Sequence, residues 1–428
     1  MVKVITYGTY DLLHYGHIKL LERAKALGDY LIVGVTADDY DKTRGKINVQ
    51  QSLMERIDAV KATGLADEII VEEYEGQKID DIKKYGIDIF TVGSDWKGQF
   101  DYLKEYCQVI YLPRTAGISS SNIRSDERNT RLLITGDKFI CDKFHKESSF
   151  VNGISSDIIE SKDFKEKLDQ YDACFIVSNP KKHYDQIKYA LEHNKHVLCE
   201  SPIALSIKEA EELEQLAQDK GLILMESIKT AYSTAYNRMI LQAKSGKIGD
   251  IVSVDAVCTS MREFIQGNLS LDSSWNSICA WGPTALLPIF QLFGTDYKKV
   301  NIISKRLDTD SKFDGFTKID FLFKNGVASA KVAKSAKSEG ELVISGTKGY
   351  IYVPAPWWKT DYYEIRFENP ENNIRQFYQL DGEGIRQELV TFLSAIQKKK
   401  DTSYINKNIT KAISGVMEKY YQDDIEEI

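Results

Sequence analysis

A chain of 428 residues is too long for one ordinary hydrophobic core, so two or three domains are expected. The 43% apolar and 28% charged residues are typical of a soluble globular protein, and a net charge of −7 is mild for this length, so nothing indicates a nucleic-acid-binding surface and no nucleic-acid partner is expected. The apolar runs are too short for a membrane span and the chain begins in a strand pattern rather than a signal peptide, so we expect a cytoplasmic protein.

Strand-like and helix-like segments alternate through the first 125 residues. Apolar runs predict strands at 2–7, 30–35, 68–71, 87–92 and 109–112, and apolar residues at helical spacing predict helices at 18–27, 52–62 and 79–85. This alternation predicts a parallel sheet with helices on both faces. Ligands of such sheets bind at the carboxyl ends of the strands.

The most informative stretch follows the first of these strands. Residues 8–17 carry two glycines, Gly8 and Gly16, and two histidines, His14 and His17, in a turn that leads into a helix. Backbone N–H groups at the start of a helix can face an anion, and histidines three residues apart can point into the same site. The stretch therefore predicts phosphate chemistry.

Three sequence blocks carry a family resemblance. They are ITYGTYDLLHYGHIKLLERAKALGDYLIVGV, VGSDWKGQFDYLKEYC and VIYLPRTAGISSS, each at the end of a predicted strand. Together they resemble the glycerol-3-phosphate cytidylyltransferases of the HxGH nucleotidyltransferase superfamily over residues 1–125. The resemblance implies transfer of CMP from CTP to a small polyol phosphate, most simply glycerol 3-phosphate, with Mg²⁺ assistance. The product would be a CDP-alditol for teichoic-acid-like or capsular polymers.

Nucleotidyl transfer needs positioned anions and donors for the charge that grows around one phosphorus. By resemblance, His14 and His17 are the principal catalytic pair. Lys46, on a loop over the triphosphate, and Arg114, with its fork of donors, act with them. The resemblance implies a nucleotide-binding set of Gly8, Thr9, Tyr10, Asp11, Gly16, Asp38, Arg56, Gly93, Asp95, Trp96, Thr115, Gly117, Ile118, Ser119 and Ser120.

Some of these assignments have plainer alternatives. Asp38 can equally cap a helix, and the basic residues Lys42 and Arg44 can equally lie in a solvated loop. Related HxGH enzymes also use ATP, and the residue pattern does not by itself identify the base of the nucleotide. No resident metal site is predicted, because the six cysteines are scattered without a C-x-x-C pair and are expected to be buried free thiols.

A charged stretch without large apolar residues, at 124–131, predicts a domain junction. Strands and helices alternate again up to about residue 250, after which strands dominate, with few helices until a predicted helix at 384–398. This change predicts a second Rossmann-like domain at 131–250 and an α+β open-sheet domain at 251–428.

The second part resembles the Gfo/Idh/MocA oxidoreductases. The blocks are NPKKH at 179–183, HNKHVLCESPIALSIKEAEELEQLAQDKGLILMES, SGKIGDIVSVDA and ISGTKGYIYVPAPWW. Of the family's G-x-G-x-x-G loop only Gly136 is present, and Ser201 stands where the family has the lysine of Glu-Lys-Pro. Ala280 and Thr284 align with the family's aspartate and histidine or tyrosine, and neither can donate a proton in their place.

These departures predict a degenerate dehydrogenase for which NAD(P) is not an expected cofactor. By resemblance, its open sheet is expected to hold a homodimer or higher homo-oligomer together. Two alternatives stay open: a bifunctional enzyme whose second part is an active NAD(P)-dependent reductase making the polyol phosphate or its precursor, and a binding or scaffold protein with an inactive transferase.

Overall fold

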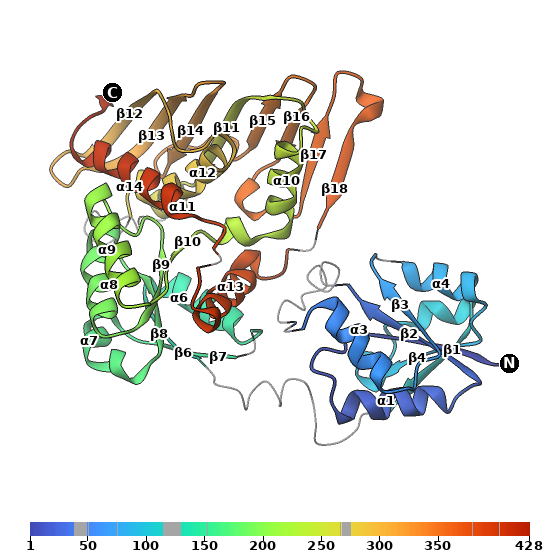
Figure 1. Ribbon diagram of the computed structural model, residues 1–428. Coiled ribbons are helices and arrows are strands. Elements are labelled where there is room, and N and C mark those ends of the chain that lie inside the picture. Colours follow the sequence, from blue (N-terminus) through green and yellow to red (C-terminus); the bar gives the residue numbers. More distant parts are fainter. Residues whose placement is uncertain are drawn as a thin grey trace. The chain divides into compact units, whose positions relative to one another are not determined.

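The computed structural model describes residues 1–37, 49, 51–74, 76–113, 130–151, 153–265, 267, 275–378, 380–401 and 403–428, without the side chains of Asp95 and Asp381. The chain divides into two compact units, Met1–Asn129 and Thr130–Ile428 (Figure 1).

The first unit is built on a five-stranded parallel sheet with the strand order β3-β2-β1-β4-β5. Its strands are β1 Lys3–Gly8, β2 Tyr30–Thr36, β3 Glu68–Glu72, β4 Ile89–Gly93 and β5 Gln108–Leu112. Between them lie α1 Tyr15–Lys25, α3 Leu53–Ala62, α4 Gln77–Tyr85 and the short helices η1 Ser94–Trp96 and η2 Asp101–Glu105. The predicted parallel α/β sheet is confirmed.

Alternate residues of the central strand bury opposite faces of this sheet. Val4 packs in the cluster that includes residues of α1 and α3, whereas Ile5 packs with Ile82 of α4 on the other face. The helix ends are set locally. Ser52 and Glu55 form a capping box at the start of α3, in which each side chain accepts a hydrogen bond from the other residue's backbone N–H.

The second unit begins with another five-stranded parallel sheet, in the order β10-β9-β8-β6-β7. Its strands are β6 Thr130–Gly136, β7 Ile154–Ile158, β8 Ala173–Val177, β9 His196–Glu200 and β10 Leu224–Ser227. The helices α8 His183–Glu192 and α9 Ile207–Asp219 pack on one face, and α6 Lys138–Ser148 and α13 Ile385–Lys398 lie together on the other. The second Rossmann-like sheet predicted from the sequence is confirmed.

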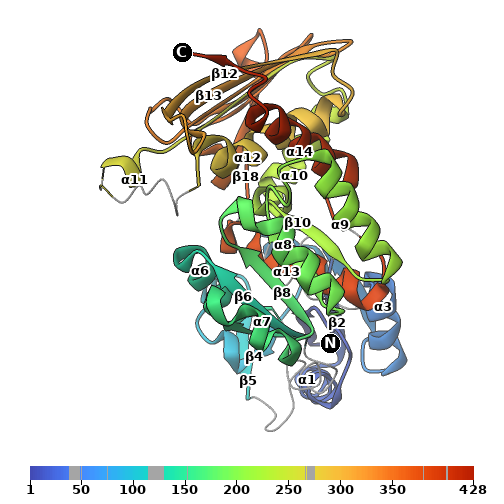
Figure 2. The same cartoon turned by 90° about the vertical axis from the view of Figure 1, so that its left-hand side faces the viewer.

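A nine-stranded mixed sheet completes this unit, in the order β18-β17-β16-β15-β11-β14-β13-β12-β19. Its strands are β11 Ile251–Thr259, β12 Lys299–Asp308, β13 Phe313–Leu322, β14 Val327–Ala333, β15 Leu342–Gly346, β16 Tyr350–Val353, β17 Tyr362–Arg366, β18 Ile374–Phe377 and β19 Glu426–Glu427. Figure 2 shows α12 Ser277–Phe293 and α14 Lys407–Tyr421 between the two sheets. The other helices are α7 Phe164–Lys167, α10 Thr234–Lys244, α11 Arg262–Ile265, η3 Ser161–Asp163, η4 Leu168–Gln170, η5 Pro180–Lys182, η6 Lys229–Tyr232, η7 Trp357–Lys359, η8 Pro370–Asn372 and η9 Asp381–Gly384.

The sequence patterns do not predict α12. Pro283 and Pro288 lie inside it, and proline removes a backbone donor and disfavours a helix interior by about 3 kcal/mol. The helix forms because most of its residues are buried between the nine-stranded sheet and α14, so tertiary packing outweighs the proline cost. Over the described ranges, none of the helices has both the length and the apolar character needed to cross a bilayer.

Candidate active site

The two histidines of the opening turn lie together at the start of α1. His14 is the N-cap residue, and its Nδ1 accepts a hydrogen bond from the backbone N–H of Gly16 at 3.0 Å. A neutral His14 ring therefore carries its proton on Nε2. The ring of His17 stacks on that of His14, with 3.9 Å between centroids and 22° between planes. The chain thus places two imidazoles at one helix N-terminus, where backbone N–H groups also favour an anion.

Gly8 makes room for a side chain of the same turn. The ring of Tyr10 is buried against it, and a Cβ at Gly8 would lie 2.9 Å from Tyr10 Cζ. Tyr10 and Leu12 both have left-handed backbone, with φ of 54° and 48°. The Tyr10 ring in turn meets the edge of His17, with 5.5 Å between centroids. The observed role of Gly8 is therefore to let the turn pack; close approach of its backbone to a nucleotide stays a prediction.

Two reciprocal hydrogen bonds tie the turn to the segment before α3. The Asp11 carboxylate accepts from the backbone N–H of Gln51 at 3.0 Å, and the side-chain oxygen of Gln51 accepts from the backbone N–H of Leu12 at 2.8 Å. Asp11 is only 4% exposed. Its carboxylate consequently fixes the shape of the turn, whatever else it contacts when a nucleotide is bound.

Arg56, on α3, contacts the backbone of the predicted site. Its side chain is fully buried, and Nη1 donates to the carbonyl oxygens of Thr9 at 2.7 Å and Thr36 at 2.9 Å. Its Nε donates to the carbonyl oxygen of Gln51 at 3.2 Å. One guanidinium thus links the turn after β1, the end of β2 and the segment before α3. This geometry gives Arg56 a positioning role, and nucleotide contact by Arg56 stays a prediction.

A buried polar network lies beside Arg56, and sequence reasoning missed it. The hydroxyl of Thr36 donates to Glu72 Oε2 at 2.9 Å, and the other carboxylate oxygen of Glu72 pairs with Lys78. The Lys78 ammonium also lies 4.7 Å from the ring centroid of Tyr7, whose hydroxyl donates to Asp81 at 2.8 Å. Burial is the main reason why the pKa of Tyr7 is raised, so its hydroxyl stays a neutral donor.

The charged members of this network are residues that the fold buries. Glu72 ends a strand, and Lys78 and Asp81 lie on α4; all three are at most 6% exposed. Charges are rarely buried unless they are paired. Without the fold, however, nothing shows that a carboxylate and a lysine six residues apart meet in the interior.

The remaining predicted residues divide into described and undescribed positions. Gly93 ends β4, and Trp96 lies in η1 with its ring 6.0 Å from that of Phe100. The side chain of Asp95 and the whole of Asp38, Lys46, Arg114, Thr115, Gly117, Ile118, Ser119 and Ser120 lie outside the described residues. Within the ranges that the structure describes, no group of three or more His, Cys, Asp or Glu side chains could hold a metal ion.

The second unit has a different arrangement at its corresponding strand end. Gly136 has a φ of 131°, and a Cβ there would lie 2.3 Å from the carbonyl carbon of Val177, so glycine is required by packing. Asp137 caps α6, and its carboxylate accepts from the backbone N–H of Ile140 at 3.0 Å. The N-terminus of α6 therefore already has a negative charge at the place where a dinucleotide pyrophosphate binds in Rossmann folds.

Ser201 stands where the resemblance to the Gfo/Idh/MocA oxidoreductases implies a lysine, and its surroundings also differ. The Ser201 hydroxyl donates to the carboxylate of Glu226, and both residues are buried. His183 is fully buried, with its ring nitrogens 2.8 and 2.7 Å from the carbonyl oxygens of Pro202 and Ser178. Burial lowers the pKa of His183 to about 4, so the ring is neutral near pH 7 and can donate only one of these bonds.

Comparison with known proteins identifies the first unit. Residues 5–161 match the cytidylyltransferase-like family. Over 126 residues the chain is 56% identical to the glycerol-3-phosphate cytidylyltransferase of Bacillus spizizenii, covering 97% of that protein and 29% of this chain. It is 46% identical to the enzyme of that name from Staphylococcus aureus, over 95% of that protein and 29% of this chain. The chain belongs to the cytidylyltransferase family. Its first unit is a nucleotidyltransferase, as the resemblance implied.

The cytidylyltransferase unit is followed by an oxidoreductase-like one. Residues 138–228 match the oxidoreductase family with an NAD-binding Rossmann fold. The fold of the chain is similar to that of KijD10, a 3-ketoreductase from Actinomadura kijaniata solved with NADP and TDP-benzene. The TM-score is 0.60 at 14% identity, covering 70% of this chain and 99% of KijD10, which shows the fold alone. The predicted pairing of the two families in one chain is confirmed.

Proposed function

We propose that the first unit transfers CMP from CTP to glycerol 3-phosphate, giving CDP-glycerol and pyrophosphate. The observation that carries this proposal is the stacked pair His14 and His17 at the N-terminus of α1. The relatives that are 46–56% identical over this unit bear the name of that activity. Other small polyol phosphates are the alternatives for the acceptor.

The geometry supports a reaction in which the protein positions groups and stabilises charge. A phosphate oxygen of the acceptor attacks the α-phosphorus of CTP, the bond to the β-phosphate oxygen breaks, and pyrophosphate leaves. The Nε2–H of His14, fixed by the Gly16 contact to Nδ1, and the stacked His17 donate hydrogen bonds to the phosphate oxygens that gain charge. Mg²⁺ enters with CTP and neutralises part of the triphosphate charge. Lys46 and Arg114 hold the triphosphate in this proposal.

The test is pyrophosphate release from CTP and glycerol 3-phosphate by the full chain. We expect His17→Ala to lower kcat by about 100-fold or more, the usual range for a group that acts on the transition state. His145→Ala is the matched control, because His145 lies exposed on α6 of the other unit. Full activity of His17→Ala would overturn the mechanism. Faster pyrophosphate release with ATP than with CTP, or with another sugar-alcohol phosphate than with glycerol 3-phosphate, would overturn the substrate assignment.

The proposal places this reaction in the cytoplasm, where CTP is made, and its product in the synthesis of a teichoic-acid-like or capsular polymer. A polymerase that transfers alditol phosphate units from the CDP-alditol would consume it. Deleting the gene in its host should remove polyol phosphate from the cell-surface polymer. A surface polymer of unchanged composition would contradict this role.

We further propose that the second unit consists of a Rossmann-like domain at 131–250 and an open-sheet domain at 251–428, and that it holds a homo-oligomer together without dehydrogenase activity. The carboxylate of Asp137 at the start of α6 and the Ser201 bond to Glu226 support the loss of activity. Titration with NADH and NADPH, followed by fluorescence, should show no binding. Saturable binding would favour the bifunctional reductase instead. Light scattering of the full chain tests the oligomer, and a monomer would contradict it.

A further inference from the structure

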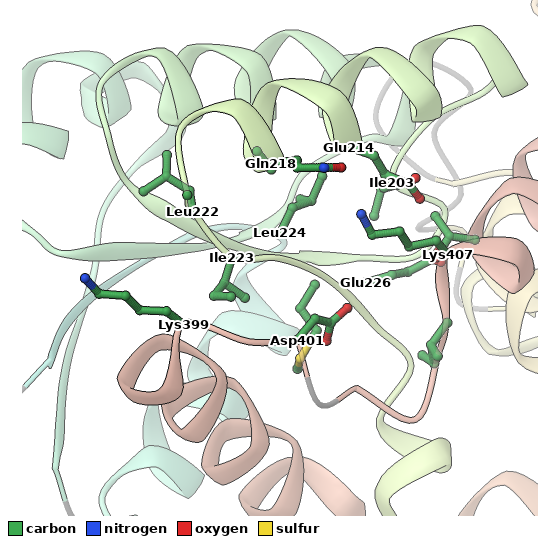
Figure 3. A pocket seen from close by; sticks show the side chains of 15 residues that line it. Ile203, Glu214, Gln218, Leu222, Ile223, Leu224, Glu226, Lys399, Asp401 and Lys407 are labelled. Atoms are coloured by element: carbon green, nitrogen blue, oxygen red, sulfur yellow. The ribbon is translucent and has the colours of Figure 1, made fainter.

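A cavity of about 310 Å³ opens beside β10, at the edge of the five-stranded sheet in the second unit (Figure 3). Its walls come from α9, from β10 and the residues just before it, and from five residues between the end of α13 and the first turn of α14, namely Lys399, Asp401, Ile405, Lys407 and Thr410. At about 30 Å³ per water molecule, a space of this size holds roughly ten waters. It is therefore large enough for a small organic ligand.

Some of the residues that line the cavity are exposed, here called the rim, and others are buried, here called the floor. Gln218, Lys399, Asp401 and Lys407 at the rim are exposed. Ile203, Met225, Glu226 and Thr410 at the floor are at most 5% exposed. Charged and amide groups thus surround the mouth, and a single carboxylate lies at the bottom.

Glu226 is the residue that points to a ligand. It is 3% exposed, and one carboxylate oxygen accepts from the hydroxyl of Ser201. The other oxygen, Oε2, is buried and makes no hydrogen bond to the described residues. Burial raises the pKa of Glu226, and the hydrogen bond from Ser201 opposes this effect. An unsatisfied buried polar atom costs about 1–3 kcal/mol, so a ligand that donates a hydrogen bond to Oε2 would recover that free energy.

The other wall residues define what kind of ligand can fill the space. Glu214 and Asp401 add acceptors, while Gln218, Lys407 and Thr410 add donors. Burial raises the pKa of Glu214, and Lys411 and Lys407 oppose this effect. The walls therefore present both ammonium and carboxylate groups, so a ligand can place an anionic end near the lysines and neutral hydroxyls near the carboxylates.

Part of the cavity wall is apolar. Side chains contributed by β10 and the segments next to it form a hydrophobic strip between the polar groups, namely Ile203, Ile223, Leu224, Met225 and Ile405. A chain of carbons that carries a hydroxyl on each carbon matches both features, because its C–H groups pack on the strip and its hydroxyls both donate and accept. Glu226 Oε2 would accept from the innermost hydroxyl, and Lys407 at the rim suits a phosphate at the other end.

From this arrangement we infer that the cavity binds the alditol chain of a small polyol phosphate or of its CDP derivative. This site is separate from the His14 and His17 pair and goes beyond the transfer reaction. The free polyol phosphate and the CDP-alditol share the recognised chain, so the experiment must separate them.

The experiment is hydrogen–deuterium exchange of the full chain with glycerol 3-phosphate, glycerol or CDP-glycerol. A bound alditol should slow exchange in peptides that cover 214–226 and 403–410. Protection by glycerol 3-phosphate alone identifies the free phosphate, and protection by CDP-glycerol alone identifies the product. Protection by glycerol as well would show that the phosphate contributes nothing to recognition. No protection of these peptides by any of the three compounds would overturn the inference.

Two variants and a control locate the effect. Glu226→Gln removes the floor charge, and Gln218→Trp covers the rim from an exposed position where folding is least at risk. We expect each of the two test variants to need at least a tenfold higher ligand concentration than the wild type for the same protection. Glu212→Gln is the control, because Glu212 lies on the same helix, accepts from Tyr184 and does not line the cavity. Pyrophosphate release should be unchanged in all three. Undiminished protection in both test variants would overturn the site without affecting the proposed transferase.

Discussion

Replacing Arg56 tests whether one buried guanidinium holds the transfer site in shape. Arg56→Met keeps most of the side-chain length and removes the donors to Thr9, Thr36 and Gln51. Hydrogen bonds from a charged donor contribute about 1.5–3 kcal/mol each, and such contributions are not additive. Because two buried and one part-buried hydrogen bond from Arg56 are lost together, we expect the free energy of unfolding of the first unit to fall by about 3–5 kcal/mol.

The same substitution should slow the reaction without weakening CTP binding in proportion. The carbonyl of Thr9 lies five residues before His14, so its release shifts the turn that carries the histidine pair. A displacement of about 1 Å in a reacting group can cost roughly 100-fold in rate. We therefore expect kcat to fall about 100-fold while KM for CTP changes much less.

The assay combines denaturant unfolding with steady-state pyrophosphate release. Arg56→Lys keeps the charge but not the fork, so it should recover only part of the stability and of kcat. Lys61→Met, at an exposed position of the same helix, is the control and should change neither quantity. If Arg56→Met unfolds like the wild type and raises only KM for CTP, the reasoning is refuted, and Arg56 is a nucleotide ligand rather than a positioning residue.

Three further outcomes follow from buried or strained positions. Lys78→Met leaves the fully buried Glu72 without its ammonium, so denaturant unfolding should show a loss of about 3–5 kcal/mol, partly restored by adding Glu72→Gln. Glu383 pairs with three lysines and has its pKa lowered from 4.5 to about 2, chiefly by hydrogen bonds that outweigh its burial. Its contribution of about 3 kcal/mol is present above pH 4.5 and lost toward pH 2, so Glu383→Gln should differ from wild type in chemical unfolding at pH 7 but not at pH 2. Gly136→Ala should destabilise the second unit by more than about 2 kcal/mol in the same measurement, whereas Gly221→Ala, with a φ of 63° and open space, should cost about 1 kcal/mol; equal losses would contradict the role of the Val177 contact.

Features that depend on neighbours in the chain could be predicted from the sequence. Most strand and helix positions of the two Rossmann-like sheets follow from apolar periodicity, which local side chains carry; β7 and α6 are exceptions that the pattern does not predict. His14 and His17 are three residues apart at a helix start, so their spacing alone brings their rings together. The two family resemblances rest on the same kind of local signal.

Features that depend on distant segments could not be predicted. The sequence gives no sign that Arg56 reaches Thr9 and Thr36, which lie 47 and 20 residues away. The helix α12 forms across two prolines because the nine-stranded sheet and α14 bury it. The spacing of residues within one element cannot encode these outcomes.

The sequence by itself determined that this protein has a nucleotidyltransferase unit followed by an altered oxidoreductase unit, because motifs and periodicity are local. Only the tertiary structure decided that Glu72 and Lys78 are paired in the interior, that the Ser201 hydroxyl meets Glu226, and that a cavity ends at that carboxylate. The physical reason is burial. Whether a charged side chain is solvated, paired or left unsatisfied is set by segments that folding brings against it from elsewhere in the chain.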